Sequence, residues 1–243
     1  MAVLIPNILL LTGSIDPRVS NTPMTVLNNP QERLKQYTDN ITKLIKYSDF
    51  DVILFCENTN YQFDYSAFIK MAAEHKKIFE AIVFKGNAEK IERSGKGFGE
   101  GEIIKYAIEN SSYLLPATVF YKLTGRLFVD NINELILKNS RKETIFIKFK
   151  FDKPMVDTRF FKSSVSFFQN TLLSSYESVN DFDGYYLEMV YYDVLKNKAN
   201  IHVFSDYPNI KGVSGSTGLN YDLGWFKLAA YRVLLKLGFL TVK

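Results

Sequence analysis

Cysteine, histidine and tryptophan are scarce in this sequence of 243 residues, which holds one, two and one of them. A single thiol cannot close a disulfide within the chain, so Cys56, in an apolar run, is expected to be buried and inert and the protein to be intracellular. His75 and His202 stand far apart, and nothing around them recommends a histidine-based zinc site or a Ser-His-Asp triad.

Long apolar segments and runs of one charge are missing too. No segment approaches the ~20 residues of a membrane span, and residues 2–5 are too short for the hydrophobic part of a secretion signal and are followed by Pro6. The net charge is +4 without a long run of Lys or Arg, which gives no support to nucleic-acid binding but favours anionic substrates or an acidic membrane face. We expect a cytoplasmic protein without a nucleic-acid partner, and leave open a peripheral contact with the inner membrane face.

The composition, with 47% hydrophobic and 23% charged residues, is that of a globular protein, and no linker or internal repeat divides it. Apolar runs at 8–11, 52–56 and 79–84 indicate buried strands, and helices are expected over about 30–47 and 65–77. Such alternation is typical of a parallel sheet with crossover helices. We predict one α/β domain of Rossmann type over the whole chain, with a mostly parallel central sheet flanked by helices.

The second half is expected to be mostly helical. A strand in two pieces over 118–130 precedes it, and residues 144–151 alternate apolar and basic side chains, which predicts a half-exposed strand antiparallel to a neighbour. The remaining expected elements are helices over 160–175 and 185–195, a short strand at 201–204 and a C-terminal helix. This last helix mixes Trp225 and Phe226 with basic residues, which suggests packing onto the body or attachment to a membrane surface.

Residues 95–111 are the most distinctive stretch, because glycines stand at every second position before the apolar pattern of a helix. A loop containing Gly97 and its neighbouring glycines can bring N–H groups, Lys96 and Glu100 close to a ligand, and the helix start behind it adds partial positive charge. This suits the phosphates of a nucleotide, while a flexible surface loop explains the glycines about as well.

Polar residues follow the carboxyl ends of the first two predicted strands. Thr12, Gly13 and Ser14 close the first strand, and Glu57 and Asn58 close the second. Ligands bind outside the carboxyl ends of parallel strands, so we expect these residues to meet the glycine-rich stretch at one crevice.

Two cations interrupt the strand-like segment at 118–130. Lys122 and Arg126 stand there with Thr124 and Gly125. They are either solvated on an edge strand or form a clamp for phosphate oxygens.

A second glycine-rich loop, residues 211–218, contains Ser214 and Ser216. Its hydroxyl and N–H groups could hold a phosphate, or the loop could be a mobile turn.

In chain order, these segments resemble the GT-A type glycosyltransferases, in particular the small bacterial and viral enzymes that build surface polysaccharides. The segments that carry the resemblance are 11–15, 56–59, 95–100, 121–126 and 215–218. The resemblance implies transfer of a sugar from a UDP- or GDP-linked donor to a carbohydrate or lipid-linked glycan. The alternatives are a CMP-sugar-dependent or nucleotidyl transferase and a non-catalytic nucleotide-binding module.

The resemblance also implies that the two halves of the chain bind different substrates. Residues 1–130 would bind the nucleotide, with base and ribose at the ends of the first two predicted strands, and residues 131–243 would form the acceptor side. The family usually holds a divalent cation, Mn²⁺ or Mg²⁺, with an Asp-x-Asp motif after a central strand. The one literal match here, residues 181–183, follows no predicted strand and suits a helix N-cap, which leaves Asp130 as the candidate ligand near the expected place. Metal-independent transfer, with Lys96, Lys122 and Arg126 stabilising the departing diphosphate, is therefore equally open.

An inverting transfer needs a base for the acceptor hydroxyl. Glu188 resembles the late acidic position of the family at a helix start, and Asp157 is the other candidate. Each also has a structural alternative, because Asp157 could cap the following helix and Glu188 could be an ordinary solvated residue.

Overall fold

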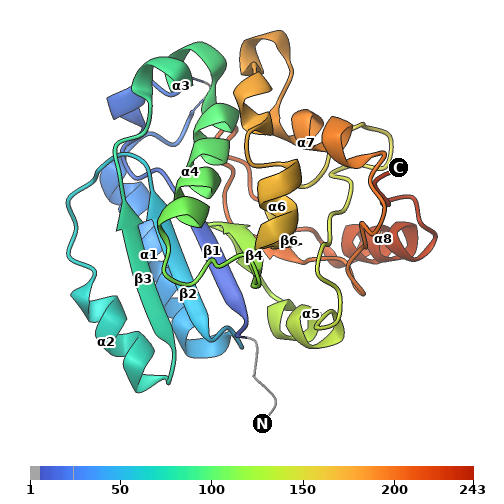
Figure 1. Ribbon diagram of the computed structural model, residues 1–243, viewed down its shortest axis with the longest axis horizontal. Coiled ribbons are helices and arrows are strands. Elements are labelled where there is room, and N and C mark those ends of the chain that lie inside the picture. The colour runs from blue at the N-terminus through green and yellow to red at the C-terminus, as the bar shows by residue number, and fades with distance from the viewer. Residues whose placement is uncertain (1–5, 24) are drawn as a thin grey trace.

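The computed structural model describes residues 6–23 and 25–243, so the apolar start at residues 2–5 lies outside the described residues (Figure 1). Its centre is a five-stranded sheet with the strand order β3-β2-β1-β4-β6. The strands β3, β2, β1 and β4 run parallel to one another, and β6 at the edge is antiparallel to β4. The strands are β1 (Ile8–Gly13), β2 (Val52–Glu57), β3 (Ile78–Val83), β4 (Val119–Thr124) and β6 (Phe160–Ser164), and β5 (Phe128–Val129) pairs separately with β7 (Ile210–Lys211).

Helices cover both faces of the sheet, as Figure 1 shows. One face carries α1 (Pro30–Tyr47), α2 (Ser66–Glu74), α5 (Ile132–Lys138) and, at its margin, α8 (Trp225–Lys236). The other face carries α3 (Ala88–Ser94), α4 (Lys96–Asn110), α6 (Val165–Thr171) and α7 (Leu187–Leu195). Three short 3₁₀ helices complete the described elements: η1 (Pro17–Ser20), η2 (Ser175–Ser178) and η3 (Asp181–Asp183).

The apolar runs form the central strands because both faces of the sheet are covered. Every residue of β1 and β2 is buried. Successive side chains of a strand point to opposite faces, so Leu9 and Leu11 join the core under α1, and Ile8 and Leu10 join the core under α4. The predicted α/β fold of Rossmann type, with a mostly parallel central sheet flanked by helices, is confirmed.

Two segments of the second half differ from the prediction. Residues 144–151 form only isolated bridges, and the side chains of Ile145, Phe146 and Ile147 are all buried, so their alternation does not mark two faces of a strand. Residues 201–204 also lack a ladder and bridge only at His202.

The expected helix over 160–175 begins later than predicted, because residues 160–164 form β6 instead. Phe160 pairs with Leu123 of β4 in this ladder. Aromatic residues suit a strand that packs on both faces, and pairing with β4 outweighs the local helical pattern.

The glycine-rich stretch is not a loop, which corrects the prediction. Helix α4 begins at Lys96, so three of the glycines lie in its first turns and are buried. A Cβ at Gly101 would overlap the Cβ of Tyr176, and one at Gly97 would lie 3.0 Å from Asp181 Oδ1. The glycines therefore allow α4 to pack closely against η2 and η3.

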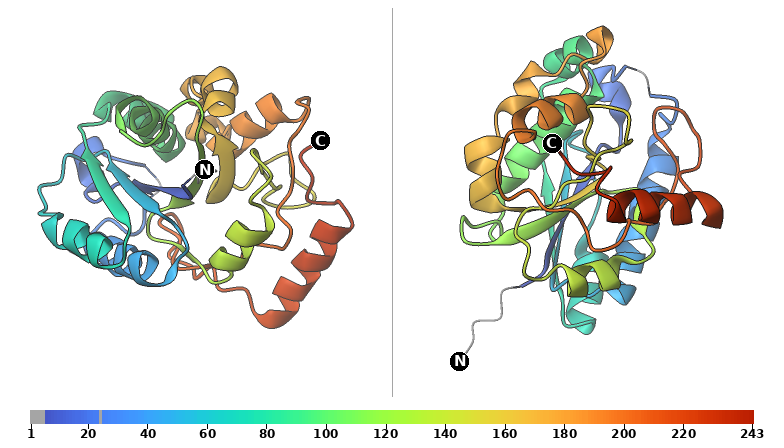
Figure 2. Two further views of the ribbon diagram at one scale, coloured as in Figure 1. Left: turned by 60° about the horizontal axis from the view of Figure 1, so that its bottom comes forward. Right: turned by 90° about the vertical axis from the view of Figure 1, so that its right-hand side faces the viewer.

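Helix α8 lies at the edge of the molecule, as both views of Figure 2 show. Leu235 is its buried residue, whereas Trp225 and Phe226 are 71% and 70% exposed. None of the helices in the described part of the chain has the length and hydropathy of a membrane span.

Candidate functional site at the carboxyl ends of the parallel strands

A cavity of about 180 Å³ opens where β1, β2 and β4 end, as expected for a parallel sheet. The start of α4, the buried side of α1 and the loop after β7 complete its wall. Ten residues that the sequence predicts for the site line this cavity: Thr12, Gly13, Ser14, Asn58, Lys96, Glu100, Thr124, Arg126, Glu188 and Ser216. Segments far apart in the sequence thus meet at one place.

Two carboxylates stand at one side of the cavity. Glu100 forms an ion pair with Lys122, a fully buried lysine of β4 that also donates to the carbonyl oxygen of Thr158 at 2.7 Å and to Thr124 Oγ1 at 3.1 Å. Lys122 does not line the cavity; it lies behind Glu100 and fixes the position of that carboxylate.

Glu188 has a different environment. It lies in the first turn of α7, and its Oε1 accepts a hydrogen bond from Thr158 Oγ1 at 3.2 Å. Burial raises the pKa of the Glu188 carboxyl, and the nearby charge of Glu100 raises it further. Glu188 therefore holds a proton more readily than an ordinary glutamate.

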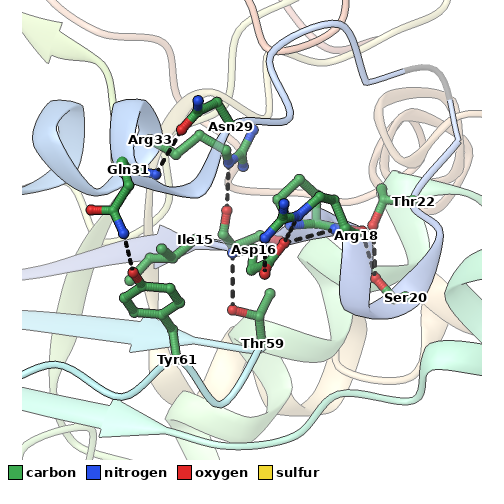
Figure 3. A network of polar contacts seen from close by, with 12 residues as sticks. Ile15, Asp16, Arg18, Ser20, Thr22, Asn29, Gln31, Arg33, Thr59 and Tyr61 are labelled. Atoms are coloured by element: carbon green, nitrogen blue, oxygen red, sulfur yellow. Dashed lines mark hydrogen bonds and ion pairs between the residues drawn. The ribbon is translucent and has the colours of Figure 1, made fainter.

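Cationic groups line the cavity as well. Arg33, from α1, is buried and donates through Nε to the carbonyl oxygen of Ser14 at 2.7 Å and through Nη1 to that of Leu27 at 2.9 Å. Figure 3 shows Arg33 reaching from α1 toward the loop after β1. Arg126 follows β4, and Lys96 at the start of α4 contacts the hydroxyl of Ser216.

The turn that carries Arg126 is held by α1. Asn40 donates through Nδ2 to the carbonyl oxygens of Gly125 at 2.8 Å and Leu127 at 2.7 Å. Gly125 does not line the cavity; its N–H donates to the carbonyl oxygen of Thr12 at 2.9 Å, and a Cβ there would lie 2.8 Å from that oxygen. Its role in the structure is to bring the ends of β1 and β4 together.

Glu57, a predicted nucleotide ligand, lies outside the cavity and is fully buried. Its Oε1 accepts hydrogen bonds from the N–H groups of Ile15 and Thr59, both at 2.9 Å, and its Oε2 accepts one from the N–H of Tyr61 at 3.2 Å. Thr59 in turn accepts from the N–H of Asp16 at 3.1 Å (Figure 3). Burial raises the pKa of Glu57, partly offset by these donors, and the residue joins the loops after β1 and β2.

Asp157, the second candidate base, is buried outside the cavity as well. Its carboxylate binds the Arg159 guanidinium with both oxygens, Oδ1 to Nε at 2.9 Å and Oδ2 to Nη2 at 2.7 Å. Burial alone would lower the pKa of Arg159, and the ion pair with Asp157 outweighs it and raises that pKa. Arg159 lines the cavity between the rings of Phe149 and Tyr221, so Asp157 acts on the site through Arg159.

The start of α4 is occupied by a carboxylate of the protein itself. Gly97 does not line the cavity, and its N–H donates to Asp181 Oδ2 at 3.1 Å. Burial raises the pKa of Asp181, and the hydrogen bond from Gly97 opposes this rise. The first residue of the literal Asp-x-Asp match therefore caps a helix 84 residues away, and the predicted phosphate cradle at this helix start is filled.

Ser214 and Asp130 are also outside the cavity. The hydroxyl of Ser214 accepts from the N–H groups of Ser216 and Thr217 at 3.3 and 3.2 Å, so it shapes the loop after β7. Asp130 is near Lys211, at 3.7 Å, and accepts from Asn209 at 3.2 Å. Among the described residues, no three His, Cys, Asp or Glu side chains gather as a metal site, and Asp130 does not fit one.

Sequence reasoning missed several residues of the cavity wall, which are Arg33, Tyr37, Thr158, Arg159 and Tyr221. A signal for the first was present, because Arg33 shares the apolar stripe of α1 with Tyr37 and Ile41 at spacings of four residues. A cation at a core position of a helix needs a special partner.

Comparison with known proteins adds a distant likeness. No family model and no curated protein matches the sequence. A crystal structure from Bacillus anthracis, described as a glucose-1-phosphate thymidylyltransferase in complex with sucrose, is similar with a TM-score of 0.48 and 12% identity, covering 85% of this chain and 89% of that chain. A likeness of this degree does not assign an activity. A function is therefore proposed from the chemistry of the residues that line the cavity.

Proposed function

We propose that this protein is a glycosyltransferase that moves a sugar from a UDP- or GDP-linked donor to a carbohydrate or lipid-linked glycan acceptor. The observation that carries the proposal is that two pairs of charged groups line one cavity. Glu188 and Glu100 lie near each other, and the guanidinium groups of Arg33 and Arg126 both lie close to Gly215. A donor with an anionic diphosphate and a neutral sugar needs cations for the first part and suits a carboxylate base near the second.

Glu188 is the proposed base. Its raised pKa makes it a better proton acceptor than an ordinary glutamate, and Thr158 orients its Oε1. In the proposed step, the Glu188 carboxylate takes the proton of the acceptor hydroxyl while the acceptor oxygen bonds to the anomeric carbon. The bond from that carbon to the phosphate oxygen breaks, and the diphosphate leaves with the electron pair. This single displacement inverts the configuration of the sugar.

The nucleoside end of the donor is proposed to lie near the ends of β1 and β2. Asn58 is 6% exposed and lines the cavity, and its Oδ1 has no hydrogen-bond partner among the described residues. A buried acceptor without a partner is costly unless a ligand supplies a donor, and a ribose hydroxyl or a base N–H would do so. Thr12 and Ser14 line the same end.

A second candidate function is nucleotidyl transfer from a nucleoside triphosphate to a sugar phosphate. The cations that line the cavity favour it, because Lys96, Arg33 and Arg126 could all contact the oxygens of a triphosphate. A phosphate nucleophile is already ionised, however, and needs no base. The carboxylates of Glu188 and Glu100 in the same cavity would repel it, so we place glycosyl transfer first.

The test begins with thermal shifts in the presence of UDP, GDP, CMP and nucleoside triphosphates, each with EDTA and with Mn²⁺. Sugar transfer from the matching donor is then measured, and so is pyrophosphate release from a triphosphate and a sugar 1-phosphate. Pyrophosphate release without sugar transfer would establish the second candidate. Binding without either reaction would indicate a non-catalytic module, and no shift with any nucleotide would refute both enzymes.

Glu188→Gln tests the role of the base. Loss of a general base lowers the rate by about 10² to 10⁴-fold, so we expect the variant to bind the nucleotide and to lose transfer to that extent. Glu74→Gln, at an exposed position of α2 outside the cavity, is the matched control and should transfer as the unaltered protein does. Full transfer by Glu188→Gln would contradict the assignment.

A further inference from the structure

Arg33 is a buried cation whose partners are all neutral. It is 6% exposed, and its guanidinium donates to the carbonyl oxygens of Ser14 and Leu27 and, at 3.4 Å, to the hydroxyl of Tyr37. In the described ranges, the arginines that form ion pairs are Arg18, Arg93, Arg159 and Arg232. Arg33 is not among them, so no carboxylate of the described residues lies within ion-pair distance of its guanidinium, and Glu57 and Asp16 act on its charge only from farther away.

Arg126 likewise has only neutral hydrogen-bond partners. Its Nη1 donates to Gln36 Oε1 at 2.9 Å and to the carbonyl oxygen of Val213 at 3.4 Å. Its Nε is buried, and over the described part of the chain it has no hydrogen-bond partner. No ion pair involves Arg126 within that part either.

The two guanidinium groups meet at Gly215. A Cβ at this glycine would lie 2.5 Å from Arg126 Nη2 and 3.7 Å from Arg33 Nη1, so both guanidinium groups lie close to the same point on the loop. Burial lowers the pKa of Arg33 and the charge of Arg126 lowers it further, while Tyr37 and the more distant Glu57 carboxylate only partly oppose this fall. Two neighbouring cations without an ion-pair partner among the described residues are costly to keep, which points to a ligand that supplies the negative charge.

Other cationic features of the site are already neutralised. Asp181 occupies the start of α4, Asp157 binds Arg159, and Glu100 pairs with Lys122. An incoming polyanion therefore finds the cations without an ion pair among the described residues at Arg33, Arg126 and Lys96, and the two arginines are the neighbouring pair.

We infer that Arg33 and Arg126 form the subsite for the diphosphate group of the ligand, with Lys96 and Ser216 at its rim. The planar guanidinium fork matches phosphate oxygens in pairs, and both guanidinium groups lie close to Gly215. This subsite needs no metal ion to hold a diphosphate. The inference deepens the proposed function. It rests on that function only in taking the diphosphate to be part of a nucleotide.

Inorganic pyrophosphate is the probe that isolates this subsite. We would measure its binding by isothermal titration calorimetry in EDTA, with the unaltered protein, Arg126→Gln, Arg33→Lys and the exposed control Arg93→Gln on α3. A hydrogen bond to a charged group contributes enough that losing it weakens binding about 10- to 100-fold, which is the loss expected for Arg126→Gln. Arg33→Lys keeps the charge and loses the fork, so a smaller loss is expected, and Arg93→Gln should bind as the unaltered protein does.

Pyrophosphate binding that is unchanged in Arg126→Gln, or that requires Mn²⁺, would overturn the inference. If Arg33→Lys fails to fold, Arg126→Gln still decides the result. Asn40 holds the turn through the backbone carbonyl oxygens on either side of Arg126, so a change of the Arg126 side chain leaves these hydrogen bonds in place. The outcome is separable from that of the proposed function. Pyrophosphate binding through the arginine pair without sugar transfer would refute the glycosyltransferase alone, and sugar transfer with unchanged binding in Arg126→Gln would refute the subsite alone.

A different observation concerns the outer face of α8. Trp225, Phe226, Val233 and Leu237 are exposed by 71, 70, 54 and 66%, and their spacing places them on one side of the helix. Exposed apolar residues that cluster in this way indicate a binding surface, whereas scattered ones do not.

The charge of this end of the chain indicates what binds there. Residues 223–243 contain Lys227, Arg232, Lys236 and Lys243 and no Asp or Glu. Arg232 is paired with Asp206, and the three lysines form no ion pair within the described residues. An apolar stripe flanked by lysines is the pattern of a helix that lies in the surface of an anionic bilayer. We propose that the outer face of α8 docks on such a surface.

Sedimentation with phosphatidylcholine vesicles, with and without phosphatidylglycerol, tests this docking. We expect binding to the anionic vesicles that falls with added salt and is lost in the double variant Phe226→Ser with Leu237→Ser. Ile69→Ser on α2, which removes an exposed apolar residue elsewhere, should bind unchanged. Absence of binding, or equal binding by the double variant, would refute the proposal. Self-association that the double variant abolishes would instead assign the face to a second copy of the chain.

Discussion

Lys162 should make the stability of this protein depend on pH in the alkaline range. The side chain belongs to β6 and is buried; its Nζ donates to the carbonyl oxygen of Asn139 at 2.8 Å and lies 5.1 Å from the centre of the Tyr121 ring. Burial lowers the pKa of Lys162 from its ordinary 10.5 to about 8. The perturbation that we consider is Lys162→Met, which keeps the length of the side chain and removes the titration.

The magnitude follows from that fall in pKa. One pKa unit corresponds to about 1.4 kcal/mol, so the fall from 10.5 to about 8 amounts to about 3 kcal/mol. The folded protein releases the proton of Lys162 near pH 8, whereas the unfolded chain keeps it until 10.5. Between these values the unfolded state binds more protons, so the free energy of unfolding rises with pH there, and below pH 8 the full penalty remains.

Urea unfolding of both proteins at neutral and at alkaline pH measures this effect. Other groups that titrate near pH 10 act alike in both proteins, so they cancel in the difference. Relative to Lys162→Met, the unaltered protein should gain about 1.4 kcal/mol per pH unit above pH 8, up to about 3 kcal/mol in total. As a control, the difference in unfolding free energy between the unaltered protein and the variant Lys70→Met, at an exposed position, should not change over this pH range. A difference that stays constant across this range, within the error of the extrapolation, would refute the reasoning.

Three further predictions concern the scaffold of the site. Gly101→Ala forces a Cβ against Tyr176, and the overpacking should cost about 1 to 3 kcal/mol of stability. The melting temperature, measured by circular dichroism, should fall by roughly 2 to 10 °C. An unchanged melting temperature would mean that η2 moves away from α4 without loss of stability. Asp157→Asn leaves the mostly buried Arg159 side chain without its partner, so urea unfolding should show a loss of about 3 to 5 kcal/mol, and a loss under 1 kcal/mol would contradict the importance of that pair. The pKa of Glu57 is raised above its ordinary 4.5, so its ionised form destabilises the folded state; the unfolding free energy of the unaltered protein should fall relative to that of Glu57→Gln as pH rises from 4.5, and a relative rise would show the opposite shift.

The sheet and the first long helix could be predicted because their signals are local. Unbroken apolar runs give strands covered on both faces, and Asn29 followed by Pro30 marks a helix start that the structure has at the same residues. The carboxyl ends of the strands then indicate where the cavity lies. This reasoning predicts that Thr12 and Asn58 lie together, and in the structure both line the cavity.

What the sequence could not show depends on partners that are distant in the chain. Residues 160–164 form a strand only because β4 is available beside them. Glu57 resembles a ligand residue at a strand end, yet its oxygens are taken up by backbone N–H groups of two loops. Arg33 is an ordinary helix residue by propensity, and its place in the cavity follows from the packing of α1 against the loop after β1.

The glycines of α4 have a consequence for the order in which the protein folds. Glycine is about 1 kcal/mol less favourable than alanine in a helix, so the first turns of α4 have little tendency to form alone. Their stability comes from Asp181 and from Tyr176, which follow about 80 residues later. We expect these turns to be unformed in the folding transition state, with low φ-values. Because Lys96 and Glu100 belong to these turns, the cavity would be among the last parts of the molecule to assemble.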